Sequence, residues 1–253
     1  MLASAPYQPQ FTWFPMADDS FDVASLAAYL HMMPGQVTRL AERGNLPGRR
    51  IGGQWQFARP EVSQWLEERM GLSDDDELAA MESRLRRDDS YGASEIDLAE
   101  LLPLETVAVP LAARTRASVI KAMCELAAVS GRVWDVAKLA DAVSQRESMA
   151  PTAMENGLAL LHPRRPQSSI LGEAVIALGI TSAGIPFGGG PSGSGMTDIF
   201  ILIAATSDHE YLRTLARVSR IVNDRDWVAQ LRSCPNATAA RELVLERDAT
   251  ISA

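Results

Sequence analysis

Residues 71–94 constrain the architecture of this chain more than any other stretch. The segment GLSDDDELAAMESRLRRDDSYGAS holds seven acidic and three basic residues and almost no large apolar ones. A segment of this composition cannot bury enough apolar surface to offset the entropy lost on folding. We therefore expect a charged linker with a solvated helix, which separates a small domain over 21–70 from a larger one over 95–250. Residues 1–20 are predicted to be a flexible lead-in.

The composition suits a soluble globular protein, because 47% of the 253 residues are hydrophobic and 22% are charged. The net charge of −8 argues against a surface that as a whole coats nucleic acid or anionic lipid, although one basic patch escapes that average. The two cysteines form no CxxC pair, so free thiols in a reducing compartment are expected. The start of the chain does not resemble a signal peptide, and the apolar run 199–205 is too short to span a bilayer. These observations predict a cytoplasmic protein with no membrane insertion.

Two short amphipathic helices and a hairpin are predicted in the small domain. Apolar residues recur at helical spacing over 23–30, and after a break Pro34 suits the first turn of a second helix. Apolar and polar residues then alternate on both sides of Gly52-Gly53, which is typical of a β-hairpin. A closing helix is predicted over 60–69. Two helices with a tight connection, followed by a hairpin, form a winged helix-turn-helix.

Basic residues dominate the stretch 36–59, which has five arginines and one acidic residue. Polar and basic side chains on the second helix of such a domain reach base edges and phosphates in a major groove, and those on the hairpin reach the backbone. The predicted DNA-binding residues are Gln36, Thr38, Arg39, Arg43, Arg49 and Arg50. Helix-turn-helix units also serve as protein-docking modules, and that alternative stays open.

This small domain resembles the winged DNA-binding domains of the excisionase and MerR type, including their RxGGxWxF hairpin. The resemblance implies DNA as a partner. Those domains usually carry Lys or Arg where this chain has Gln54, and this difference lowers the expected affinity for phosphate. A homodimer would compensate for that loss.

Helices that alternate with strands are predicted in the larger domain, and this alternation indicates an α/β layer structure. Residues 207–210 read as a capping box, with Ser207 at the cap and Glu210 three residues later. The glycine-rich stretch 188–195 lacks a following Gly-Lys-Ser/Thr and is interpreted as a flexible connection between strands. Helices are expected over 115–129, 133–146, from 208, over 224–233 and 236–247, and buried strands over 174–181 and 198–205.

His162 directly follows an apolar run and precedes Pro163, Arg164 and Arg165. Because proline ends regular structure, we expect the imidazole at the end of an element and near the surface. Two guanidinium groups would make that surface attractive to an anion. On these observations alone, a reactive histidine and an ordinary loop histidine both remain open.

The segment 146–164, RESMAPTAMENGLALLHPR, resembles the active-site segment of fructose/mannitol-type enzyme IIA domains of the bacterial sugar phosphotransferase system (PTS). That type includes the nitrogen-regulatory IIA proteins, and its pattern is Arg-Glu, then Thr, then Gly-Ile-Ala-Ile-Pro-His. The resemblance extends over about 95–248 and implies a IIA-type sheet with flanking helices. It also implies that the phosphocarrier protein HPr phosphorylates His162, which can pass the phosphoryl group to a IIB component. The residues that match the pattern without a gap are Arg146, Glu147, Thr152, Gly157 and His162.

The chemistry of these residue types agrees with the resemblance. A neutral imidazole is nucleophilic and can hold a labile phosphoryl group, so neither a metal nor another cofactor is expected. Phosphoryl transfer needs positioning and charge stabilisation, which Arg146 would supply as a second catalytic residue. The residues expected to support them are Thr152, Arg164, His209 and Tyr211.

Two departures from the family pattern bear on function. The proline that usually precedes the histidine is replaced by Leu161, and Tyr211 occupies the position of a second active-site histidine. His209, two residues earlier, either substitutes for that histidine or is an ordinary surface residue.

The sequence therefore predicts a PTS regulatory protein that binds DNA and is phosphorylated at His162. An alternative is an enzyme IIA subunit that relays phosphate to a sugar-specific IIB partner. Another is a IIA-fold binding module without catalysis, which Tyr211 favours. A phosphohistidine phosphotransferase activity is preferred but left undecided.

Overall fold

The computed structural model describes residues 20–30, 32–72, 79, 83, 96–189 and 195–252. By their internal contacts, the residues divide into a first unit, Met1–Val62, and a second unit, Ser63–Ala253. We describe each unit by itself. The predicted lead-in up to residue 19, most of the predicted linker and the centre of the glycine-rich connection lie outside the described residues.

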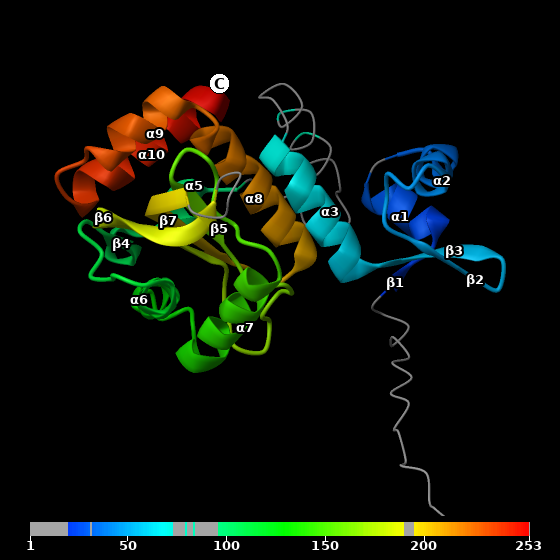
Figure 1. The fold of residues 1–253 in the computed structure, drawn as a ribbon, viewed down its shortest axis with the longest axis horizontal. Helices are drawn as coiled ribbons and strands as arrows, with labels where there is room; N and C mark the ends of the chain where they lie inside the picture. The colour runs from blue at the N-terminus through cyan, green and yellow to red at the C-terminus, as the bar shows by residue number, and fades with distance from the viewer. Residues whose placement is uncertain are drawn as a thin grey trace, which may run out of the picture. The chain divides into compact units, whose positions relative to one another are not determined.

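The first unit contains the predicted helices and hairpin (Figure 1). Its order along the chain is β1 (Ser20–Phe21), α1 (Val23–Tyr29), α2 (Pro34–Glu42), β2 (Arg49–Ile51), β3 (Gln54–Ala58) and the first turn of α3 (Arg59–Leu72), a helix that continues past the end of this unit at Val62. The two-residue strand β1 was not predicted. It pairs antiparallel with β3, which gives a three-stranded sheet of order β1-β3-β2.

Local signals in the sequence account for these elements. The Asp22 carboxylate caps α1 by accepting a hydrogen bond from the Ser25 backbone N–H at 2.7 Å. Gly52 and Gly53 have φ angles of 60° and 83°, which a two-residue turn between antiparallel strands requires. The core of this unit includes the fully buried side chains of Leu26, Val37, Phe57 and Val62.

The second unit is a mixed α/β fold, which confirms the predicted fold class. Its helices are α5 (Leu98–Leu101), η2 (Leu104–Thr106), α6 (Arg116–Ala128), α7 (Val136–Met149), α8 (Asp208–Val222), α9 (Arg225–Arg232) and α10 (Ala237–Ser252). Its strands are β4 (Val107–Ala108), β5 (Leu158–Leu161), β6 (Val175–Gly189) and β7 (Gly195–Ala204), in the order β4-β6-β7-β5. Strands β6 and β7 run antiparallel, whereas β4 is parallel to β6 and β5 is parallel to β7.

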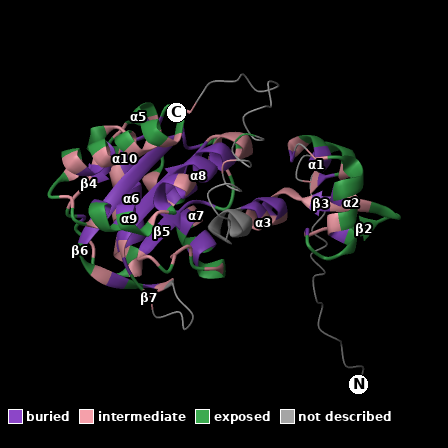
Figure 2. Ribbon diagram, turned by 90° about the horizontal axis from the view of Figure 1, so that it is seen from above, coloured by how far each residue is buried: buried purple, intermediate pink, exposed green. Residues whose placement is uncertain are grey.

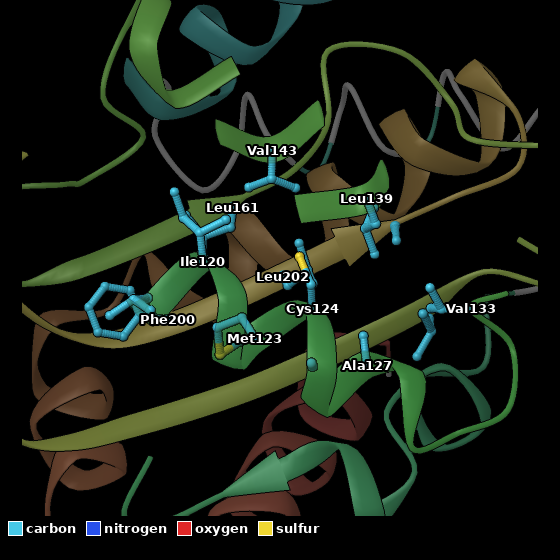
Figure 3. Packing of buried hydrophobic residues seen from close by; sticks show 14 of the residues in the cluster. Ile120, Met123, Cys124, Ala127, Val133, Leu139, Val143, Leu161, Phe200 and Leu202 are labelled. Carbon is cyan, nitrogen blue, oxygen red and sulfur yellow. The ribbon is translucent and has the colours of Figure 1, made fainter. Parts of the chain in front are cut away.

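Helices cover both faces of this sheet (Figure 1). Side chains at alternate positions of a strand point to opposite faces, and both faces here are apolar. Val175 and Ala177 of β6 belong to a buried cluster that also contains residues of α6 and α7. Figure 3 shows part of this cluster, including Ile120 of α6. Ile176 and Leu178 face the other layer, built from α5, α8, α9 and α10. Burial on both faces explains why the strands read as continuous apolar runs, and Figure 2 shows the sheet buried beneath these helices.

Two predictions for this unit need correction. Strand β6 continues to Gly189, well past the predicted end at 181, because an irregularity in the pairing after Ile180 lets the chain rejoin β7 at Ile185. The predicted capping box is only half formed. Ser207 caps α8, but the Glu210 carboxylate accepts from the backbone N–H and the hydroxyl of Thr206 at 2.9 and 2.8 Å instead of from the cap residue.

Candidate functional site

His162 lies immediately after the end of β5, an edge strand whose four residues are all buried. Its Nδ1 lies 2.9 Å from the Leu160 carbonyl oxygen. Because a carbonyl oxygen can only accept, Nδ1 must carry the hydrogen in this contact. The neutral ring therefore has its lone pair on Nε2, and the backbone of β5 fixes which nitrogen is the nucleophile.

The predicted surface position of His162 was wrong, because its exposed fraction is only 3%. Pro163 does end the strand as expected, but it is itself buried, so the chain stays in the interior at this point. Arg164 and Arg165, the next two residues, are exposed.

Tyr211 packs against the imidazole from the first turn of α8. The centroids of the two rings are 5.2 Å apart, their planes are inclined by 39°, and the tyrosine is 6% exposed. His162 and Tyr211 are far apart in the chain and were both identified from the sequence, and the fold places their rings in contact. His209 lies two residues earlier on the same helix and is half-buried.

The last turn of α7 carries the Arg-Glu pair of the motif. Arg146 is 8% exposed, and its Nη1 donates to the Ala150 carbonyl oxygen at 2.8 Å. Glu147 is 1% exposed and accepts a hydrogen bond from the Thr152 backbone N–H at 3.1 Å, and another from the Thr152 hydroxyl. Its other oxygen pairs with Arg116 Nη2 at 2.9 Å. These contacts tie α7 to the segment that leads into β5.

Sequence reasoning missed Arg116, which lies directly after Thr115, the N-cap residue of α6. A cation in the first turn of a helix opposes the helix dipole. This unfavourable placement was the available signal that the arginine has a partner elsewhere in the fold.

Gly157 ends the turn before β5 and has a φ of 82°. A Cβ at this position would lie 2.9 Å from Arg232 Nη2. Arg232 donates to the Asn156 carbonyl oxygen at 2.8 Å and to the Asp198 carboxylate at 2.7 Å. The backbone conformation therefore favours glycine at this position, and a Cβ would in addition displace the guanidinium group of Arg232.

On the second helix of the first unit, three of the predicted DNA-binding side chains form hydrogen bonds with backbone groups three or four residues earlier in the chain. The Gln36 amide oxygen accepts from the Met33 N–H at 2.9 Å and so caps the start of α2. Thr38 and Arg39 donate to carbonyl oxygens one turn earlier, at 3.1 and 3.0 Å. Arg43 is the C-cap residue of α2 and is exposed.

The two hairpin arginines form ion pairs within the same unit. Arg49 lies 2.8 Å from the Glu61 carboxylate, and Arg50 lies 3.5 Å from that of Glu42. The Arg50 guanidinium also stacks over the Trp55 ring, 5.1 Å from its centroid. Exposed ion pairs of this kind contribute only about 0–1 kcal/mol, so a phosphate group can displace the carboxylates.

Residues 100–247 match the model of the protein family described as "Phosphoenolpyruvate-dependent sugar phosphotransferase system, EIIA 2". The chain belongs to this family. Residues 20–70 match a second model, described as "Helix-turn-helix domain". The protein therefore joins a PTS EIIA-type phosphoryl transfer domain to an N-terminal helix-turn-helix domain.

Known proteins agree with the EIIA assignment. The PTS system fructose-specific EIIA component of Haloferax volcanii is 23% identical over 150 residues, which are 59% of this chain and 96% of that protein. The crystal structure of the nitrogen regulatory protein IIA-Ntr from Neisseria meningitidis has a TM-score of 0.51 at 16% identity, over 58% of this chain and 97% of that one. At this identity the structural likeness shows the fold alone. Within the described ranges, the chain has no helix long and apolar enough to cross a membrane.

Proposed function

We propose that this protein is a cytoplasmic transcription regulator of the PTS, which binds DNA through its helix-turn-helix domain and is phosphorylated at His162 by the phosphocarrier protein HPr. The observation that carries the proposal is the contact between His162 Nδ1 and the Leu160 carbonyl oxygen, because it leaves Nε2 as the nucleophile.

The proposed transfer is a single displacement at phosphorus. The Nε2 lone pair attacks the phosphorus atom, and a new P–N bond forms. The bond from phosphorus to the donor atom of the carrier breaks, and its electron pair returns to that atom. The proton on Nδ1 stays in place, since the Leu160 carbonyl oxygen holds it. Little acid–base chemistry is required, and positioning together with charge stabilisation carries the step.

The proposal assigns to Arg146 the role of stabilising the negative charge of the phosphoryl group. Arg146 and His162 are both buried, and a guanidinium suits a phosphoryl dianion because it can donate two parallel hydrogen bonds. The imidazole is only 3% exposed, so the proposal requires the surroundings of the ring to open when the carrier docks.

The link to DNA is electrostatic. Phosphorylation places about two negative charges on the phosphoryl oxygens, and the ring that keeps its Nδ1 hydrogen becomes a cation and offsets one of them. The helix-turn-helix domain presents Arg43, Arg49 and Arg50 at its exposed surface, and its affinity for a polyanion depends on such cations. Charge added to the EIIA domain, or a change in how two protomers associate, would therefore alter binding to DNA.

A comparison of DNA affinity before and after phosphorylation tests this function. Wild type and His162→Ala are incubated with phosphoenolpyruvate, enzyme I and HPr, and each is titrated by fluorescence anisotropy against DNA selected from a random library. We expect the affinity of wild type to change at least several-fold on phosphorylation and that of His162→Ala to stay constant. Binding to no DNA sequence, or equal changes in both proteins, would contradict the proposal.

Relay of phosphate to a IIB component is the second candidate, favoured by the match to a fructose-specific EIIA component. The contact between Tyr211 and His162 separates the two functions. A phenol, unlike an imidazole, cannot become a cation by taking up a proton, so Tyr211 cannot exchange positive charge with the His162 ring as a histidine could. If the protein is a regulator, Tyr211→His should shorten the lifetime of the phosphorylated form in the presence of a IIB protein. If phosphorylated wild type already transfers its phosphoryl group to IIB in a single turnover, the result would favour the relay.

A further inference from the structure

The segment from Ala150 to Ala153 is held at every residue. Arg146 donates to the Ala150 carbonyl oxygen at 2.8 Å, and Pro151 packs so closely on Gly188 that an added Cβ there would lie 2.8 Å from the proline ring. Glu147 accepts two hydrogen bonds from Thr152, and Ala153 forms a bridge with Ala159 of β5. A segment between a helix and a strand does not need this many restraints for connection alone.

The restraints lead to the reactive imidazole. The Thr152 carbonyl oxygen accepts from the Leu160 N–H at 3.4 Å, and the Leu160 carbonyl oxygen in turn accepts from His162 Nδ1 at 2.9 Å. The Glu147 carboxylate is therefore joined to the histidine through Thr152 and the backbone of Leu160, whose N–H and C=O belong to two successive peptide groups. A shift of Thr152 would move the carbonyl oxygen that sets the tautomer.

Arg116 supplies the counter-charge that allows the Glu147 carboxylate to be buried. Glu147 is 1% exposed, and a buried carboxylate without a counter-charge is strongly unfavourable. The Arg116 guanidinium supplies that charge at 2.9 Å and donates also to the Glu147 backbone carbonyl oxygen, while its own flat face lies 5.4 Å from the Phe187 ring centroid. Arginine suits this site better than lysine, because its planar group can bond two oxygens and stack on a ring at once.

We propose that Glu147, paired with Arg116, is a positioning residue that fixes the tautomer and placement of His162 for phosphoryl transfer. It acts through Thr152 and Leu160 and does not touch the phosphoryl group. The inference rests on the proposed function for its effect on rate, but its effect on the tautomer does not depend on any phosphorylation.

The test uses the full-length protein with ¹⁵N-labelled histidine. The variants are Glu147→Gln, which keeps the shape but removes the charge, and Arg116→Gln with Arg116→Lys as its conservative partner. Glu125→Gln is the matched control, because Glu125 also pairs with a basic residue of α6, Lys121 at 3.7 Å, but both side chains are more than half exposed. Long-range ¹H–¹⁵N spectra report the tautomer of each of the three histidines, and His162→Ala assigns its signal.

We expect wild type and Glu125→Gln to show His162 as a single form with hydrogen on Nδ1. Glu147→Gln and Arg116→Gln should show a mixture with the Nε2–H form, and HPr should phosphorylate them about 10- to 100-fold more slowly, as for an Ångström-scale misplacement of a reacting group. Arg116→Lys should recover part of the rate. If Glu147→Gln does not fold, Thr152→Val makes the same test by removing the hydroxyl donor.

An unchanged tautomer in the folded variants would overturn the inference, whether or not the rate falls, because a slower rate would then reflect general destabilisation. If wild type is not phosphorylated at all, the proposed function fails. The tautomer comparison still decides whether Glu147 positions the ring.

Discussion

Replacing Gly157 by alanine tests how the turn before β5 is held. The glycine has a φ of 82°, and an added Cβ would lie 2.9 Å from Arg232 Nη2. That nitrogen donates to the Asn156 carbonyl oxygen at 2.8 Å, while Nε of the same side chain pairs with Asp198 at 2.7 Å. The substitution therefore strains the backbone and also pushes a guanidinium group away from its acceptor.

The two effects can be estimated separately. A residue with a Cβ in the left-handed region costs about 1–2 kcal/mol, and losing a hydrogen bond from a charged donor costs about 1.5–3 kcal/mol. Gly157→Ala should therefore lower the free energy of unfolding by about 2.5–5 kcal/mol, which lowers the melting temperature of a domain of this size by about 5–20 °C. Gly131→Ala is the matched control, since Gly131 has a φ of 74° and no atom within 4 Å of an added Cβ. It should lose only the backbone contribution of about 1–2 kcal/mol.

Differential scanning calorimetry of the full chain resolves the comparison, with the transition of the EIIA domain followed in both variants. A double variant, Gly157→Ala with Arg232→Ala, should be less destabilised than the sum of its single changes, because both remove the same contact. Equal losses for Gly157→Ala and Gly131→Ala, or strict additivity in the double variant, would refute the argument that Arg232 constrains this turn.

Three further predictions concern individual groups. Burial raises the pKa of the Cys124 thiol to about 12. Iodoacetamide at pH 8 should therefore label only Cys234 in the folded protein, and intact mass should show both cysteines labelled after unfolding. The hydrogen bond from the Ser25 backbone N–H lowers the pKa of the Asp22 carboxyl in the folded protein. The resulting stabilisation is complete above the unfolded-state pKa and is lost as the pH falls through the lower folded-state pKa. Asp22→Ala should therefore lower the melting temperature of the helix-turn-helix domain at pH 7, and its difference from wild type should shrink as the pH is lowered from about 4; a constant difference would contradict the cap. Glu42→Gln frees Arg50, whose pairing distance is 3.5 Å, and should tighten DNA binding by up to about fivefold in anisotropy titrations at low salt, whereas weaker binding would mean that the carboxylate orients the arginine for DNA.

The fold class followed from the sequence because long periodic segments carry most of the fold. The helices around 115–129 and 224–233 and the apolar core of the two long strands were all recognisable from periodicity and caps. Strands β1 and β4 have two residues each, and no period can be read from so short a run. They are strands only because a longer strand, β3 or β6, pairs with them.

Less of the site was accessible to sequence reasoning. A motif indicated His162 and Arg146, but a motif does not say how deeply a side chain is buried, and the imidazole is covered where an exposed one was expected. Arg116 belongs to a different helix from Glu147, and only the folded chain brings the two together. Contacts between distant elements depend on packing, which leaves little trace in local spacing.

The most direct test of the account is the mass of the protein after incubation with phosphoenolpyruvate, enzyme I and HPr. Intact-mass spectrometry at neutral to alkaline pH keeps a phosphohistidine intact, and wild type is compared with His162→Ala and His209→Ala. The account predicts one acid-labile phosphoryl group on wild type and on His209→Ala and none on His162→Ala. No adduct on wild type, with an HPr shown to be active on another EIIA domain, or an adduct that survives in His162→Ala, would contradict it.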